Sequence, residues 1–200
     1  AFSFPMKEML PTGMIWAPVV VGIVGGIFGS VFNKGLLFAS TRMKKLPVPR
    51  YVVIFLTMVL ALLAGLYNPI LLGGGHGLIE RLATTAVSAK ILVGFFALRM
   101  ILVWTGYGSG AQGGIFLPVL TLGALIGALL HGLILGGDMY YANFLYLGMT
   151  AILSSVVQAP LLSILLVSEM SGTMLQMISV PPTAMVAYIV AQLLKNGPIY

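Results

Sequence analysis

Cysteine is absent from the 200 residues, and acidic residues are scarce, with four Asp and Glu in total. Without cysteine the chain can form no disulfide, no thiolate nucleophile and no thiolate metal site. The two histidines, His76 and His131, lie far apart in the sequence, so the HExxH pair of a zinc protease is missing as well. These absences exclude cysteine catalysis and zinc proteolysis from the candidate functions.

Charge of either sign is also rare, because charged residues make up 7% of the chain while apolar residues make up 60%. Mean hydropathy is +1.09, whereas soluble domains carry roughly 25% charged residues. A bilayer-spanning helix needs about 20 mainly apolar residues, so the chain can supply several such helices. No alternation of apolar and polar residues is long enough for a barrel strand. The sequence therefore predicts an all-α integral membrane protein that crosses the membrane several times.

The net charge of +6 comes from ten basic residues against four acidic ones. Four of the ten, Arg42, Lys44, Lys45 and Arg50, lie within residues 40–50. Because short loops rich in Lys and Arg stay on the cytoplasmic side of a membrane, this loop is predicted to be cytoplasmic, and the cell membrane is the expected location. The basic excess is explained by topology, so no nucleic-acid partner is expected.

Apolar segments separated by glycine, proline and charged residues predict the helices of this membrane protein. Their expected ranges are residues 14–39, 51–67, 78–86, 89–105, 115–135, 141–157, 161–167 and 180–194. Glycines at four-residue spacing, at 22 and 26, 25 and 29, and 123 and 127, flatten helix faces for close packing. Several segments are too short for an ordinary span, which favours broken helices around a polar pathway.

The glycine-rich segment at residues 106–114 is the most informative of these breaks. It separates two strongly apolar segments, and a helix begins directly after it. A helix that begins inside a membrane directs free N–H groups and a positive dipole end toward whatever occupies the space before it, which favours an anion. The alternative from pattern alone is an exposed loop between two ordinary spans.

At residues 108–130 the sequence GSGAQGGIFLPVLTLGALIGALL resembles the CLC family of chloride channels and chloride/proton antiporters. The family pattern there is a glycine-rich turn, GGIFAP and a helix. Further segments are similar to family motifs in the same order: GIVGGIFGSVFNKGLL to GIxFGIFGPIFNKxVL, GGGHGLI to GGGFNLI, QAPLLSILLVSEM to RAPLTGIxLVxEM, and NGPIY to GKPLY. Together these segments cover nearly the whole chain.

The resemblance implies a bundle of short, broken and tilted helices built from two inverted halves, with anion sites at the interface between the halves. Residues 1–200 would be the C-terminal half, that is, the second half of the inverted repeat. The first-half motifs GSGIP and GxEGP do not occur in the sequence, so an N-terminal half is expected as a missing partner. The resemblance further implies a homodimer, with residues 160–194 at the subunit interface and membrane lipid around it.

The resemblance also implies the site residues. Gly114, Ile115 and Phe116 would bind chloride, the transported ligand, through backbone N–H groups at a helix start, and Tyr200 would add its phenolic O–H. The residues alone leave alternatives open, because an Ile-Phe pair is common in a core and a tyrosine is common at a membrane interface. No metal or cofactor is expected.

Ionisable and polar residues within the apolar segments are further candidates. Arg99 is predicted to be a partnered structural charge or a contributor to positive potential at a vestibule, with an anion ligand as the alternative. Glu169 is predicted to have a structural role at a helix end, and His131 to be packed or interfacial. Two rival classes remain. An intramembrane serine hydrolase would need the motif G-x-S-G around Ser109, but Tyr107 stands in the place of its first glycine. A cation channel would need carboxylates or carbonyl filters in its pathway.

Overall fold

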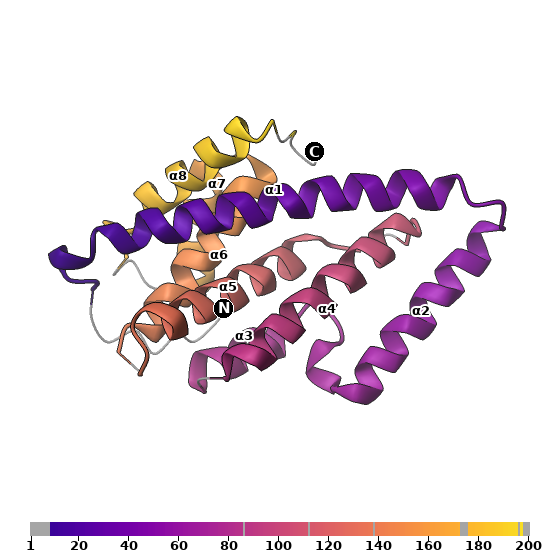
Figure 1. The fold of residues 1–200 in the computed structure, drawn as a ribbon, viewed down its shortest axis with the longest axis horizontal. Helices are drawn as coiled ribbons and strands as arrows, with labels where there is room; N and C mark the ends of the chain where they lie inside the picture. The colour runs from indigo at the N-terminus through magenta and orange to yellow at the C-terminus, as the bar shows by residue number, and fades with distance from the viewer. Residues whose placement is uncertain are drawn as a thin grey trace.

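The computed structural model describes residues 9–85, 87–111, 113–137, 139–172, 176–195 and 197. All regular structure within these residues is helical (Figure 1). The elements are η1 (Thr12–Met14), α1 (Trp16–Lys44), α2 (Arg50–Tyr67), η2 (Pro69–Leu71), α3 (His76–Thr84), α4 (Ala89–Gly108), α5 (Phe116–Ile134), α6 (Tyr141–Val157), α7 (Pro160–Ser171) and α8 (Val180–Leu193). The predicted all-α fold class is confirmed.

The basic segment at residues 40–50 is less of a loop than the sequence predicts. Helix α1 continues through Arg42 and Lys44, so only residues 45–49 connect it to α2. The extension has a physical cause, because basic side chains in the last turn complement the negative end of the helix dipole. Pro47 and Pro49 then prevent the helix from continuing. The other helix bounds agree with the sequence prediction to within a few residues, and α6 agrees at both ends.

Four helices of the described chain are long and apolar enough to cross a membrane, namely α1, α2, α4 and α5. Helices α6, α7 and α8 are apolar but shorter, and α3 has only nine residues. A helix too short to span the bilayer needs protein or a polar cavity to satisfy the backbone groups at its ends. The chain is a multi-pass integral membrane protein.

Helix α1 packs through two glycine faces that the four-residue spacing predicts. A Cβ on Gly22 would lie 2.9 Å from the Thr183 carbonyl oxygen, and Gly26 also faces α8. Gly25 and Gly29 instead meet side chains of α6. Helix α1 contacts both of these helices, and Figure 1 shows it beside α8 and crossing α6. Close backbone approach through glycine thus joins three helices that are distant in the sequence.

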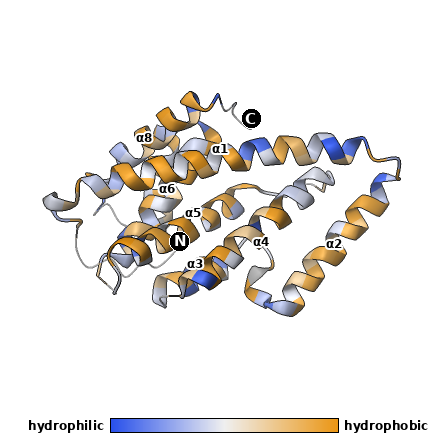
Figure 2. Ribbon diagram, viewed as in Figure 1, coloured by the Kyte–Doolittle hydropathy of each residue, from blue (hydrophilic) through white to orange (hydrophobic). Residues whose placement is uncertain are grey.

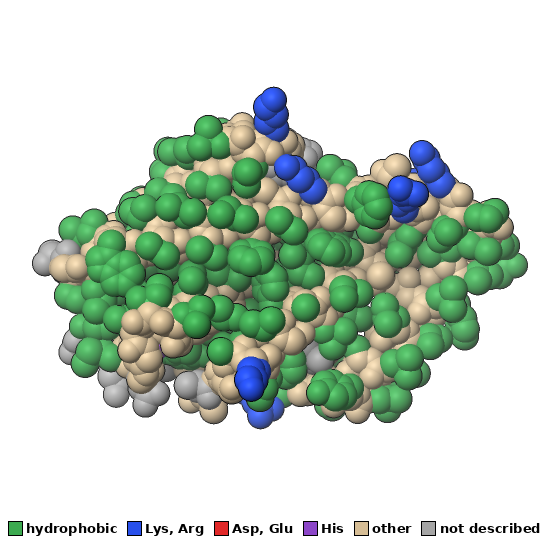
Figure 3. All heavy atoms as spheres, viewed as in Figure 1, with side chains coloured by type: hydrophobic (Ala, Val, Ile, Leu, Met, Phe, Trp, Pro, Cys, Tyr) green, Lys and Arg blue, Asp and Glu red, His purple; other side chains and the backbone are tan. Residues whose placement is uncertain are grey.

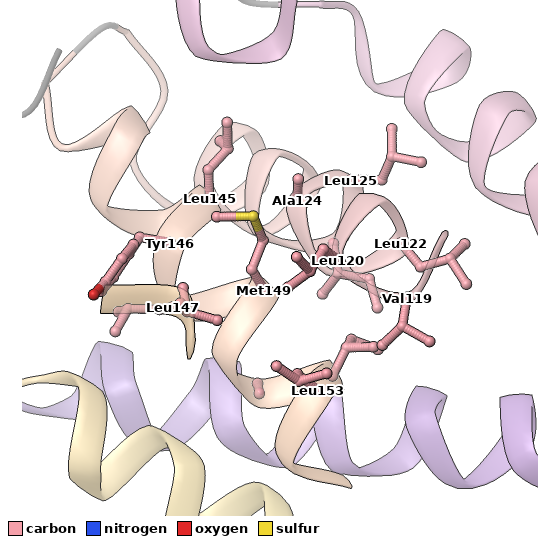
Figure 4. Packing of buried hydrophobic residues seen from close by; sticks show 14 of the residues in the cluster. Val119, Leu120, Leu122, Ala124, Leu125, Leu145, Tyr146, Leu147, Met149 and Leu153 are labelled. Atoms are coloured by element: carbon pink, nitrogen blue, oxygen red, sulfur yellow. The ribbon is translucent and has the colours of Figure 1, made fainter. Parts of the chain in front are cut away.

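The core of the molecule is centred on the pair α5 and α6 (Figure 4). Gly123 and Gly127 of α5 face the backbone of α6, and Gly148 of α6 faces α5 in return. Every residue of α6 from Tyr141 to Val156 is buried. The middle of α5 is therefore held against α6 by one of the most closely packed contacts in the chain.

The face of the molecule drawn in Figure 3 is largely apolar, and most residues of the helices are hydrophobic (Figure 2). Helix α2 illustrates this, because its buried residues are only Val53, Ala64 and Gly65. Large side chains such as Phe55 and Leu66 are 63% and 75% exposed. An apolar surface of this extent needs lipid or another protein segment against it.

Candidate anion site

Helix α5 begins at Phe116, directly after the glycine-rich segment, and Ile115 is its N-cap residue. Among the described residues, no side chain caps this helix start. The first helical hydrogen bond at this end runs from the Val119 N–H to the Ile115 carbonyl, at 3.0 Å, and Pro118 has no N–H. The amides that precede Val119 are consequently the orphan donors expected at a helix N-terminus, as the sequence predicts.

A cavity of about 310 Å³ lies against this helix start. Gly113, Gly114 and Ile115 form part of its wall, and Arg99 and Gly73 form another part. The side chain of Phe116 does not line this cavity and packs against the core instead. The helix start therefore opens onto a cavity whose wall includes the buried side chain of Arg99.

Arg99 has the partner that the sequence analysis predicts for it. The side chain is 2% exposed, and its Nη2 donates to the Gly73 carbonyl oxygen at 2.7 Å. The Thr121 hydroxyl donates to the neighbouring Gly74 carbonyl at 3.1 Å. Gly75 completes the turn with a φ of 94°, which favours glycine. Arg99 and the glycines at 73–75 both stand out in the sequence, but no sequence pattern predicts that they are in contact.

Two other polar candidates have structural surroundings. The ring of His131 is buried, its Nε2 lies 2.7 Å from the Met139 carbonyl, and it stacks edge-on against Tyr141 and Phe144. This confirms a packed histidine. Glu169 is exposed in the last turn of α7, at the helix end that the sequence predicts.

Ser109 is part of a turn. Its hydroxyl donates to the Gly106 carbonyl at 2.7 Å and accepts from the Ala111 N–H at 3.4 Å. A serine nucleophile instead needs a hydrogen-bonded base, and both of these partners of the hydroxyl are backbone groups. The serine hydrolase alternative is not favoured.

Tyr200 lies outside the described residues, but the segment before it has a partner that sequence reasoning missed. Asn33 of α1 donates through Nδ2 to the Gly197 carbonyl at 3.3 Å and to the Val156 carbonyl at 3.0 Å. Lys34 donates to the Leu194 carbonyl at 3.0 Å. The sequence did contain a signal for these contacts, because the polar pair Asn33 and Lys34 interrupts an otherwise apolar helix.

The fold and the site together define a membrane protein of broken helices in which an uncapped helix start faces a cavity. The chain belongs to the CLC family, since the family model described as "Voltage gated chloride channel" matches residues 1–192.

Curated relatives support the assignment. The chain is 37% identical over 210 residues to the H(+)/Cl(-) exchange transporter ClcA of Vibrio campbellii, covering 99% of this chain and 44% of the relative. It is 32% identical over 198 residues to ClcA of Klebsiella pneumoniae, covering 95% of this chain and 42% of the relative. The chain thus spans less than half the length of these relatives.

Solved structures give the same fold. A slow cyanobacterial Cl-/H+ antiporter is 28% identical, with a TM-score of 0.87 over 100% of this chain and 48% of that one. A CLC-type fluoride/proton antiporter is similar in fold, with a TM-score of 0.78 over 96% of this chain and 48% of that one, at 20% identity.

Proposed function

We propose that this chain takes part in the transmembrane transport of chloride or a similar anion, and that the anion binds at the start of α5. The ligands would be the N–H groups at Gly114, Ile115 and Phe116, joined by the hydroxyl of Tyr200. The observation that carries the proposal is the uncapped helix start, which opens onto the cavity of about 310 Å³. Chloride transporters among the relatives support the same activity.

Amide donors suit an anion that must be released again. Neutral N–H groups replace part of the hydration shell of the ion without the full charge of a side-chain cation. Arg99 lines the cavity, and its guanidinium donates to the Gly73 carbonyl. Its positive charge therefore acts on the cavity, while this hydrogen bond fixes the position of the side chain. A site of this kind binds an anion and still allows turnover.

We further propose that residues 1–200 act as the C-terminal half of a larger membrane domain. The support is that relatives matched along nearly the whole chain are more than twice as long. In an inverted-repeat transporter the site lies between two halves. We expect no coupled anion flux in liposomes that contain this chain alone, and flux when an N-terminal half is supplied. Flux from the chain alone would contradict the proposal.

Substitutions at the helix start test the site itself. A Cβ on Gly114 would meet no atom of the described chain within 4 Å, and Gly114 does not have a positive φ. A valine there would consequently act on the approaching ion, with little direct effect on the fold. Loss of one hydrogen bond to a charged group costs about 1.5–3 kcal/mol, so Gly114→Val should weaken chloride binding by about tenfold or more.

Calorimetric titration of chloride into the complete protein is the measurement, with Ile115→Val as the matched control. The control changes one methyl group and leaves the backbone donors in place, so its affinity should stay within about twofold of the unmodified protein. If Gly114→Val binds chloride as tightly as the unmodified protein, the site does not lie at this helix start.

The exposed apolar faces of the late helices support a homodimer through residues 160–194, which we also propose. On α7, Leu161 and Leu165 are 76% and 63% exposed. On α8, Met185, Ile189 and Leu193 follow at four-residue spacing and are 46%, 49% and 77% exposed. Each set lies on one helix face, as a subunit contact requires.

A further inference from the structure

A second and larger cavity, of about 610 Å³, lies where α1 ends, α2 begins and α4 ends. Lys44 and Leu46 line it from the end of α1 and the connection that follows, and Arg50 lines it from α2. Tyr107 and Ser109 line it from the end of α4. Its volume lies in the range of small-molecule sites, roughly 300–1,000 Å³, and is many times that of a halide ion.

The charge of this cavity is positive. Lys44 and Arg50 are exposed cations at its wall, and none of the described residues that line it is acidic. The guanidinium of Arg50 lies against the glycine-rich segment, with its Nη2 3.5 Å from the Gly110 carbonyl oxygen. Arg42 and Lys45 add further positive charge within the same helix end and connection. An anion in this cavity would contact two side-chain cations. An anion at the start of α5 would instead be bound mainly by backbone amides.

Phosphate is the anion that this combination fits best. A guanidinium offers paired N–H donors that match phosphate oxygens, and an ammonium adds a mobile point charge. Basic pockets between membrane helices bind phospholipid headgroups for this reason. The cavity is large enough for a phosphate together with a glycerol-sized group. A single inorganic ion would leave most of the cavity empty.

The surroundings favour a lipid over a soluble phosphate. One face of α2 begins next to Arg50 and is apolar and open along the whole helix. Its side chains Tyr51, Phe55, Met58, Leu62 and Leu66 are 73%, 63%, 67%, 59% and 75% exposed. The spacing of three and four residues places them on one side of the helix. An acyl chain attached to a headgroup in the cavity would have this face to lie against.

We propose that the cavity between the ends of α1 and α4 and the start of α2 binds the phosphate headgroup of an anionic phospholipid through Lys44 and Arg50. The cavity shares Tyr107, Ala111 and Gly113 with the cavity in front of Ile115. A bound headgroup would therefore contact the same segment that leads to the start of α5. This site is independent of whether the chain carries chloride.

Native mass spectrometry of the complete protein in detergent tests the proposal, with phosphatidylglycerol as the probe and phosphatidylcholine as the neutral comparison. We expect tighter binding of phosphatidylglycerol, and at least a tenfold loss of that binding in the double variant Lys44→Gln, Arg50→Gln, since each charged hydrogen bond contributes about 1.5–3 kcal/mol. The matched control is Arg81→Gln, Lys90→Gln, which removes the same charge from exposed residues on α3 and α4.

Three outcomes would overturn the proposal. The first is equal binding of the two lipids. The second is a loss of phosphatidylglycerol binding in the control variant that matches the loss in the cavity variant, which would show a general charge effect. The third is displacement of phosphatidylglycerol by inorganic phosphate or glycerol phosphate at equal concentration, which would assign the cavity to a soluble phosphate.

Discussion

The closest helix contact of the core provides the sharpest test of the fold. A methyl group added at Gly127 of α5 would lie 2.7 Å from the Phe144 carbonyl carbon and 2.8 Å from the Leu145 Cα, and closer still to the carbonyl oxygen. Ordinary contacts of this kind are 3.4–4 Å long. The obstacle is backbone, which cannot rotate away as a side chain can. Gly127→Ala must therefore push α5 and α6 apart.

The expected magnitude follows from two opposing effects. Overpacking a core costs about 1–3 kcal/mol and occasionally more, whereas replacing glycine by alanine within a helix gains up to about 1 kcal/mol. Gly132 lies five residues later in the same helix, is exposed, and has no atom within 4 Å of an added Cβ. Gly132→Ala should consequently be neutral or stabilising, and Gly127→Ala should lower the free energy of unfolding by about 2 kcal/mol.

Unfolding of the purified protein in mixed micelles with increasing dodecyl sulfate measures this difference. Tryptophan fluorescence of a protein in which Trp16 is replaced by Phe is a suitable signal, because the indole N–H of Trp104 donates to the Phe32 carbonyl at 3.0 Å between α4 and α1. If Gly127→Ala and Gly132→Ala unfold at the same detergent fraction, the close contact between α5 and α6 does not exist in the protein.

Three further predictions address topology, assembly and the buried charge. Leu46→Cys, introduced into a chain without native cysteine, should resist an impermeant thiol reagent in intact cells, while Tyr67→Cys at the other end of α2 should be labelled; the reverse pattern would invert the topology. Crosslinks between subunits should form through Leu165→Cys and not through Ile23→Cys of α1; crosslinks confined to α1 would contradict the proposed dimer. Arg99→Met should lower the free energy of unfolding by about 1.5–3 kcal/mol, because the Gly73 carbonyl loses a charged donor; an unchanged detergent midpoint would show that the bond contributes nothing.

Helix positions could be predicted from the sequence because apolar segments and their glycine and proline boundaries are local signals. The glycine pairs of α1 and α5 also predicted close packing, and each pair meets a partner helix. Which helix each face meets is a long-range fact. Gly22 and Gly26 face α8 while Gly25 and Gly29 face α6, and no local pattern distinguishes the two partners.

The candidate site was predictable only in part for the same reason. The helix start at Phe116 could be located, because the glycine-rich segment ends there. The hydrogen bond between Arg99 and Gly73 joins residues 26 positions apart, and the bonds of Asn33 reach 123 and 164 positions along the chain. Contacts of this range depend on the packing of all the helices between them.

The two glycine faces of α1 have a mechanical consequence. Because α1 is in near-backbone contact with α6 and with α8 at once, it cannot slide along either helix without colliding with the other. These three helices should therefore move as one rigid body in any conformational cycle. Helix α2 buries only three of its own residues, so displacing it from this body breaks the fewest contacts. Within this chain, α2 is therefore the helix that moves most easily, and it lies beside both cavities.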